Sequence, residues 1–196
     1  MDVMDAITKR RSIRRFKPDP IPDEVLVELV NGARLSPTGA NFQPLKFLVV
    51  KHPARLAEVF TTLRWGAYVT PKRNPPEGHR PMGYIIILQD TRLKVYDVGL
   101  DVGLAAAAIS FGAGKFGLGT CLIASADRDQ LKEILNLPEY LTSKLVVALG
   151  TPDEDPVAED MAAAAEDVRY WLDDNDRLHV PKRRLDEVMI IDHPGV

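Results

Sequence analysis

The chain has 196 residues, of which 45% are hydrophobic and 27% charged, the balance of a globular protein with a sizeable core. Its net charge of -3 at neutral pH argues against a dedicated nucleic-acid binder, for which a positive charge is expected. The single cysteine, Cys121, excludes an intramolecular disulfide and a Cys-rich zinc site, and is typical of a reducing cytosol, so we expect a cytoplasmic protein. No stretch resembles an export signal or a membrane span, and with no internal repeat or linker we expect residues 1–196 to form one domain.

The N-terminal residues predict a short helix followed by a strongly basic segment. Apolar residues recur at helical spacing over 2–9, and the run from Arg10 to Lys17 then carries five cationic side chains around Ser12. Forked guanidinium groups and a hydroxyl satisfy phosphate oxygens well, so the run predicts an anion-binding segment. For a basic octapeptide by itself, a solvated charged surface is the alternative.

The hydrophobic pattern of the remaining chain alternates between helices and strands. Its periodicity predicts helices over 22–35, 54–63, 95–116 and 127–135, and buried strands over 45–50, 84–88, 117–123 and 144–149. The longest helix, 95–116, is rich in small residues that would let another helix approach closely, and it is a candidate for a subunit interface. Near the C-terminus, alanines 162–165 predict a short exposed helix and 185–191 an edge strand.

Two loops carry the features of ligand-binding segments. The first, 36–44, contains threonine, asparagine and glutamine side chains and leads into a buried strand. The second, 65–83, contains aromatic residues and four prolines without a clear period, and loops of this length in a compact domain are commonly functional. We expect the second loop to set the choice of substrate.

Side chains for covalent or acid-base catalysis are scarce in this chain. The four histidines are scattered without metal-ligand spacing, so we predict no metal site. The GxSxG elbow and the P-loop are absent, and Cys121 lies in an apolar strand, where it is expected to pack rather than react. We therefore predict no catalytic side chain and a redox cofactor that carries the reaction.

Four segments together carry a resemblance to a known family. They are Arg10–Phe16, Ser36–Pro44, Gly117–Cys121 and Pro181–Leu185. In this order they resemble the four motifs of the FMN-dependent nitroreductase family, and they span nearly the whole chain. The resemblance implies an α+β, nitroreductase-like fold, with a central mixed or antiparallel sheet flanked by helices, and an intertwined homodimer with FMN at its interface.

The resemblance also implies a set of cofactor-binding residues. Arg10 and Ser12 would hold the FMN phosphate together with Lys182 and Arg184. Arg14 would lie at the pyrimidine edge of the flavin, with Arg11 nearby. The remaining implied contacts are those from the partner subunit (Pro37, Thr38, Asn41 and Gln43) and those made by backbone beside the isoalloxazine (Leu118, Gly119 and Thr120).

The resemblance implies an FMN-dependent oxidoreductase. We expect reduction by NADH or NADPH and reoxidation by a nitroaromatic, a quinone or a similar electron-poor acceptor in a ping-pong cycle, with small molecules rather than nucleic acid or membrane as partners. Three alternatives stay open on the sequence: another flavin reaction on the same fold (reductive dehalogenation, flavin fragmentation or dehydrogenation), a non-enzymatic flavin-binding protein, or a basic interaction module without ligand.

Overall fold

The computed structural model describes residues 2–69, 74–95, 97–161 and 167–192. The chain divides into two compact units, Met1–Glu154 and Asp155–Val196. Within the described ranges, no helix combines the length and the apolarity needed to cross a lipid bilayer.

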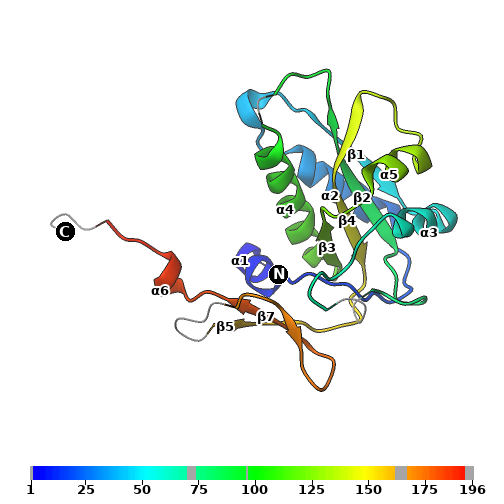
Figure 1. The fold of residues 1–196 in the computed structure, drawn as a ribbon. Helices are drawn as coiled ribbons and strands as arrows, with labels where there is room; N and C mark the ends of the chain where they lie inside the picture. Colours follow the sequence, from blue (N-terminus) through cyan, green and yellow to red (C-terminus); the bar gives the residue numbers. More distant parts are fainter. Residues whose placement is uncertain (1, 70–73, 96, 162–166, 193–196) are drawn as a thin grey trace. The chain divides into compact units, whose positions relative to one another are not determined.

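The first unit is built on a four-stranded antiparallel sheet with strand order β1-β2-β4-β3 (Figure 1). Its strands are β1 (Leu45–Val50), β2 (Gly83–Asp90), β3 (Gly119–Ile123) and β4 (Leu141–Gly150). The two central strands are almost wholly buried because helices cover both faces of the sheet, and apolar and β-branched side chains dominate them. All four predicted strands are confirmed.

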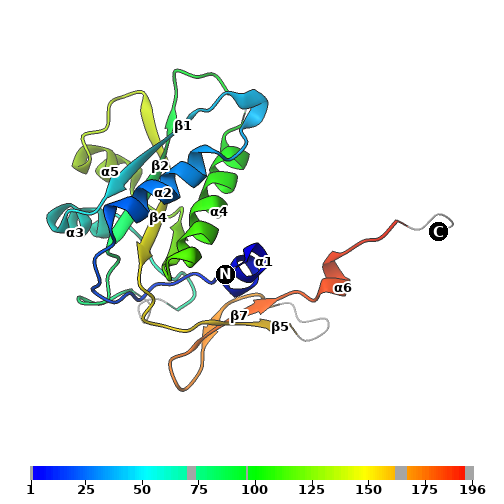
Figure 2. The same cartoon turned by 180° about the vertical axis from the view of Figure 1, so that it is seen from behind.

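One face of the sheet is covered by α2 (Asp23–Arg34) and α4 (Gly99–Lys115), as Figure 2 shows from behind. The buried face of α4 carries the small residues Ala105, Ala106 and Ala113. A Cβ on Gly112 would lie 3.1 Å from Leu29 Cδ2 on α2. The prediction that small residues let a second helix approach closely is therefore confirmed.

The opposite face is covered by α3 (Pro53–Thr61) and α5 (Arg128–Ile134). Val59 and Leu131 bury their side chains fully against Tyr84 and Val146 of the sheet. Asp127 caps α5, since its side chain accepts a hydrogen bond from Gln130 N at 3.1 Å. Two short helical segments complete the unit: α1 (Val3–Lys9) and the 3-10 helix η1 (Gly39–Asn41).

The second unit contains a three-stranded sheet that the sequence did not reveal. Its strand order is β5-β7-β6, with β5 parallel and β6 antiparallel to β7. The elements of this unit are β5 (Val157–Asp160), β6 (Trp171–Leu172), β7 (Leu178–Lys182) and the short helix α6 (Leu185–Val188).

Two predicted elements require correction. The edge strand predicted over 185–191 is wrong: its first four residues form α6, whose acidic first turn, Asp186 and Glu187, favours the positive end of a helix. The helix predicted over 95–116 begins only at Gly99, because Asp97 Oδ1 accepts a hydrogen bond from Gly99 N at 2.7 Å and forms a turn there. The predicted alanine helix over 162–165 lies outside the described residues.

Candidate functional site

The basic segment runs beside the start of β3 in an extended conformation. After α1 ends at Lys9, Ser12 forms a parallel bridge with Thr120, and Ile13 N donates a hydrogen bond to Thr120 O at 2.9 Å. Phe16 forms a second, antiparallel bridge with Pro152. The structure therefore places two of the predicted motifs, Arg10–Phe16 and Gly117–Cys121, side by side.

Two buried side chains anchor the segment to the sheet. Ile13 is 6% exposed and Phe16 is fully buried. A Cβ on Gly119 would lie 2.5 Å from Ile13 Cγ1, and a Cβ on Gly150 would lie 2.8 Å from Phe16 Cδ1. Glycine at these two positions therefore leaves room for the Ile13 and Phe16 side chains. Burial of each of these side chains contributes on the order of 1.5–3 kcal/mol to the stability of the fold. Ser12 and Arg14, the neighbours of Ile13, are only partly buried.

A carboxylate from the end of the first unit holds the segment's backbone. Glu154 Oε1 accepts a hydrogen bond from Arg14 N, and a second one from Arg15 N at 3.2 Å. Hydrogen bonds to an ionised acceptor are stronger than neutral ones. Glu154 is a residue that sequence reasoning missed, because nothing in the sequence pairs a residue at 154 with backbone groups 140 positions earlier.

The segment leaves hydrogen-bond donors open. In the part of the chain that the structure describes, the Arg10 guanidinium and the Ser12 hydroxyl make no hydrogen bond or ion pair. Arg11 differs, because its Nη1 donates to Thr8 O at 2.7 Å and to Arg10 O at 2.6 Å. Burial, and then the neighbouring charge of Arg10, lower the pKa of Arg11. The open Arg10 guanidinium next to a second cation, Arg11, is a local positive potential that an anion would neutralise.

The turn before β3 supports this side of the site. Gly117 adopts a φ of +69°, which favours glycine, and Leu118 N donates to Ala113 O at 3.0 Å. The buried Thr120 hydroxyl donates to the Ser110 hydroxyl on α4 at 3.1 Å. Leu118, Gly119 and Thr120 therefore lie on a fixed turn and strand directly beside Ser12.

The polar loop lies elsewhere in the first unit. Gly39 N donates to Asp101 Oδ1 at 3.0 Å, which ties η1 to the first turn of α4. The loop thus lies at the beginning of α4, whereas α1 lies near the end of that helix (Figures 1 and 2). The predicted cofactor residues of this loop are partly or fully exposed: Pro37, Thr38, Asn41 and Gln43.

The second basic cluster belongs to the second unit. Lys182 is the last residue of β7 and is exposed. Arg184 is also exposed and forms a two-pronged ion pair with Asp186, with Nε···Oδ1 and Nη2···Oδ2 both 3.0 Å. Their predicted convergence with Arg10 on one phosphate stays a prediction.

Cys121 and the long loop can be placed in part. Burial raises the pKa of Cys121 to about 11, which agrees with its predicted role in packing. Trp65 is buried and stacks on Phe60 with ring centroids 5.8 Å apart, while the Arg80 guanidinium lies 4.2 Å above the same Phe60 ring. Residues 70–73 lie outside the described ranges.

A family model named "Nitroreductase family" matches residues 7–73 and 94–151, which include the basic segment, the polar loop and the turn before β3. The chain belongs to the nitroreductase family. The predicted family is thereby confirmed.

Relatives of the nitroreductase chain carry two kinds of name. A protein of Methanothermobacter thermautotrophicus named "Putative NADH dehydrogenase/NAD(P)H nitroreductase" is 27% identical over 187 residues, which cover 93% of this chain and 88% of that protein. An "Iodotyrosine deiodinase" of Haliscomenobacter hydrossis is 27% identical over 177 residues, which cover 78% of this chain and 80% of the deiodinase.

Solved structures confirm the predicted α+β, nitroreductase-like fold. A "putative nitroreductase in complex with fmn" from Desulfovibrio desulfuricans matches with a TM-score of 0.69 and 21% identity over 98% of each chain. A nitroreductase family protein from Clostridium novyi matches with a TM-score of 0.67 and 24% identity, over 78% of this chain and 87% of that one.

Asp101 is a second residue that sequence reasoning missed, and here a signal exists. It is the only charged residue between Gly99 and Gly114 in a helix of small and apolar residues. A carboxylate on such a helix is buried only when it finds hydrogen-bond partners, and Asp101 is 3% exposed. A single charged residue in such a helix is therefore a sequence signal that could have identified Asp101 as a buried, hydrogen-bonded carboxylate.

Proposed function

We propose that this nitroreductase-family chain is an FMN-dependent NAD(P)H oxidoreductase that reduces nitroaromatics, quinones or similar electron-poor acceptors. The observation that carries the proposal is the pair of open donors, the Arg10 guanidinium and the Ser12 hydroxyl, fixed beside the Thr120 backbone. The names of the relatives and the FMN complex of a structural neighbour support it.

The donor set fits a phosphate. FMN phosphate carries about 1.5 to 2 negative charges near neutral pH, and guanidinium and hydroxyl donors satisfy its oxygens. Arg10 lies among cations whose mutual repulsion a phosphate would relieve, and the lowered pKa of Arg11 reports part of that repulsion. We therefore assign the phosphate to Arg10 and Ser12, joined by Lys182 and Arg184.

The other residues would orient the ring system. Arg14 would face the pyrimidine edge of the flavin, where a cation stabilises the negative charge of the reduced ring, with Arg11 nearby. Leu118, Gly119 and Thr120 would offer backbone groups beside the isoalloxazine. Glu154 would keep Arg14 in place, because it holds the backbone N–H of that residue. Bound FMN supplies the redox chemistry, in which electrons are accepted from NADH or NADPH and passed on to the acceptor.

A homodimer is part of the proposal. The loop contact at Asp101 and the Ser110 contact to Thr120 are nine residues apart on α4, about 14 Å along the helix. The polar loop and the basic segment of one copy therefore lie at different places along α4. We assign Pro37, Thr38, Asn41 and Gln43 to the flavin of a second copy. A dimer of this kind would also cover exposed apolar side chains. On α1 and α4 these include Val3 (71% exposed), Met4 (63%) and Leu100 (68%).

Three measurements test the proposal. Light scattering with size-exclusion chromatography should give twice the chain mass. Apoprotein mixed with FMN should retain yellow flavin after gel filtration. Without oxygen, the loaded protein should then be reduced by one equivalent of NADH or NADPH per flavin, and it should oxidise further nicotinamide when a nitroaromatic or a quinone is added. Retained flavin that neither nicotinamide reduces would contradict the oxidoreductase and leave a flavin-binding protein.

Reductive dehalogenation is the second candidate, and matches to two iodotyrosine deiodinases over 78% and 76% of this chain favour it over the other flavin reactions. The two candidates share the phosphate and flavin contacts and differ in the acceptor. Reduced, flavin-loaded protein incubated with 3-iodotyrosine should release iodide if this candidate is right. Nitroaromatic turnover without iodide release favours the first candidate.

A further inference from the structure

The loop between α2 and β1 holds an unfavourable backbone conformation. Ala40, Asn41 and Gln43 have φ values of +46°, +56° and +51°, in the left-handed region that side chains with a Cβ disfavour. Three such residues within four positions make a loop that needs outside contacts to keep its shape.

Hydrogen bonds within the loop form its turns. Asn41 N donates to Thr38 O at 2.9 Å, Phe42 N donates to Gly39 O at 3.0 Å, and Gln43 N donates to Thr38 Oγ1 at 3.1 Å. These bonds shape the loop without fixing its position on the rest of the protein.

The end of the loop is tied to the sheet, because Pro44 O accepts a hydrogen bond from Asp90 N at 2.8 Å, and Asp101 provides the shorter of the two links from residues 36–43 to α4. Its Oδ1 accepts from Gly39 N at 3.0 Å, whereas the Ser36 hydroxyl reaches Leu104 O only at 3.5 Å. Over the described residues 36–43, these are the two hydrogen bonds that join the loop to α4. The ionised acceptor at the shorter distance is the stronger of the two.

Packing beneath the loop does not replace this link. A cavity of about 200 Å³ lies there, lined by Asp101 together with Thr38 and Gln43 of the loop and with Arg34 and Lys46. Asp101 is nevertheless 3% exposed, on a helix of small and apolar residues. A buried carboxylate is costly without hydrogen-bond partners, and its place in the first turn of α4 puts it at the favourable end of the helix dipole.

We propose that Asp101 is a positioning residue for the flavin loop, acting through Gly39 to hold residues 36–43 in the shape that meets the flavin. The inference rests on the proposed function, because it gives this loop a cofactor to meet. Asp101 itself need not touch the flavin, since its effect is transmitted by the Gly39 hydrogen bond.

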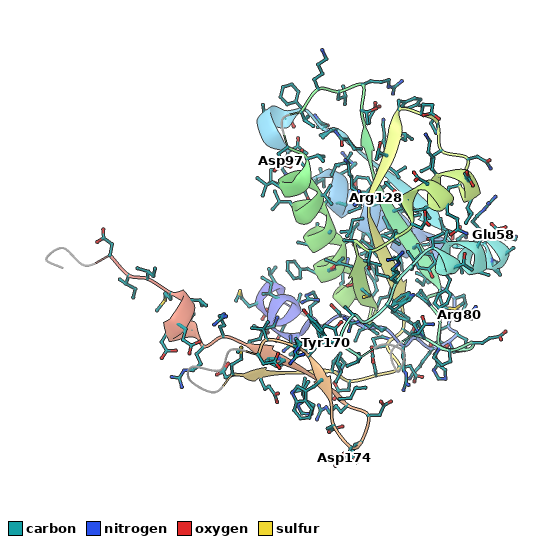
Figure 3. All side chains as sticks on the ribbon, viewed as in Figure 1. Glu58, Arg80, Asp97, Arg128, Tyr170 and Asp174 are labelled. Atoms are coloured by element: carbon teal, nitrogen blue, oxygen red, sulfur yellow. The ribbon has the colours of Figure 1, made fainter. Side chains whose placement is uncertain are left out.

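The test compares three substitutions. Asp101→Ala removes the acceptor, and Asp101→Asn keeps an oxygen at the same place without the charge. Asp97→Ala is the matched control: Asp97 also accepts a backbone N–H at the start of α4, from Gly99 at 2.7 Å, but it does not bond to the loop. It is labelled in Figure 3. If Asp101→Ala does not fold, Asp101→Leu fills the same space without an acceptor.

The first measurement is hydrogen exchange at the Gly39 amide in protein without FMN. Asp101→Ala should speed this exchange by about 10- to 100-fold, the range for losing a hydrogen bond to a charged acceptor. The Asn variant should stay within about threefold of wild type, since it keeps an acceptor. Unchanged exchange in Asp101→Ala, or an equal change in Asp97→Ala, overturns the inference.

The second measurement is the FMN dissociation constant and the visible spectrum of the bound flavin. Asp101→Ala should raise the constant by at least about tenfold and shift the spectrum, while Asp101→Asn restores both. Wild-type affinity and spectrum in Asp101→Ala would contradict the positioning role. Failure of wild-type protein to bind FMN would contradict the proposed function instead, and the exchange measurement distinguishes the two failures.

Discussion

Gly119→Ala should break the contact that places the basic segment on β3. The new Cβ would lie 2.5 Å from Ile13 Cγ1, 2.9 Å from Ile13 Cβ and 3.0 Å from Pro152 Cγ. Carbon atoms pack at about 3.5–4.0 Å, so the overlap with Ile13 is about 1 Å. Ile13 is 6% exposed and has no free space to retreat into, so the backbone must move and weaken the Ile13 N to Thr120 O hydrogen bond of 2.9 Å.

The expected cost follows from these two losses. Overpacking costs about 1–3 kcal/mol and a lost hydrogen bond about 0.5–1.5 kcal/mol, so Gly119→Ala should lower the free energy of unfolding by roughly 2–4 kcal/mol. Urea unfolding followed by tryptophan fluorescence measures it. Gly32→Ala is the control, because nothing lies within 4 Å of its added Cβ, and a helical alanine should gain about 0.5–1 kcal/mol.

A double mutant isolates the contact. Ile13→Ala removes the Cγ1 atom that the new Cβ meets, so Gly119→Ala should cost at least about 1 kcal/mol less in that background than in wild type. A Gly119→Ala protein as stable as wild type, or strict additivity with Ile13→Ala, would refute the packing argument and with it the reason for glycine at this position.

Three further predictions concern titrating groups. The Arg92 hydrogen bond lowers the pKa of Asp90 to about 2. The pair therefore stabilises the fold at pH values above 3.8, the ordinary pKa of the carboxyl group, and this contribution is lost as pH falls through about 2. Asp90→Asn should lower the free energy of unfolding at neutral pH and leave it unchanged in strong acid. The Glu159 hydrogen bond raises the pKa of His179 above 6.5, so its contribution is present below pH 6.5 and is lost as pH rises through the raised pKa. Glu159→Gln should lower that pKa in an NMR titration, and an unmoved pKa would contradict the assignment. Burial should keep Cys121 unreactive toward iodoacetamide in native protein at mildly alkaline pH, with labelling only after unfolding.

Local patterns predicted the scaffold of the first unit well. Its strands are buried apolar runs bounded by turn residues, and α2 and α3 each carry one apolar face, so periodicity located them. The family was likewise visible in the sequence, and three of the four motifs lie within the residues that the family model matches, whereas Pro181–Leu185 lies outside them. Helix ends were less accurate, since Asp97 forms a turn that delays the start of α4 to Gly99.

Contacts between distant residues could not be predicted from the sequence. The resemblance assigned Gly119 to the flavin-binding residues, whereas the structure shows that glycine at this position also admits the Ile13 side chain. The Glu154 hydrogen bonds join residues about 140 positions apart, and the sheet of the second unit has short strands with weak alternation. Such features depend on tertiary pairing, which local propensity does not encode.

The central claim is that Arg10 and Ser12 hold the phosphate of FMN. Titrating apoprotein with FMN and with riboflavin, which lacks the phosphate, tests it most directly. Wild type should bind FMN at least about 100-fold more tightly than riboflavin, because the phosphate adds two or more charge-assisted hydrogen bonds. Arg10→Ala should remove most of that difference while the affinity for riboflavin stays unchanged. Equal affinity of wild type for FMN and riboflavin would contradict the account.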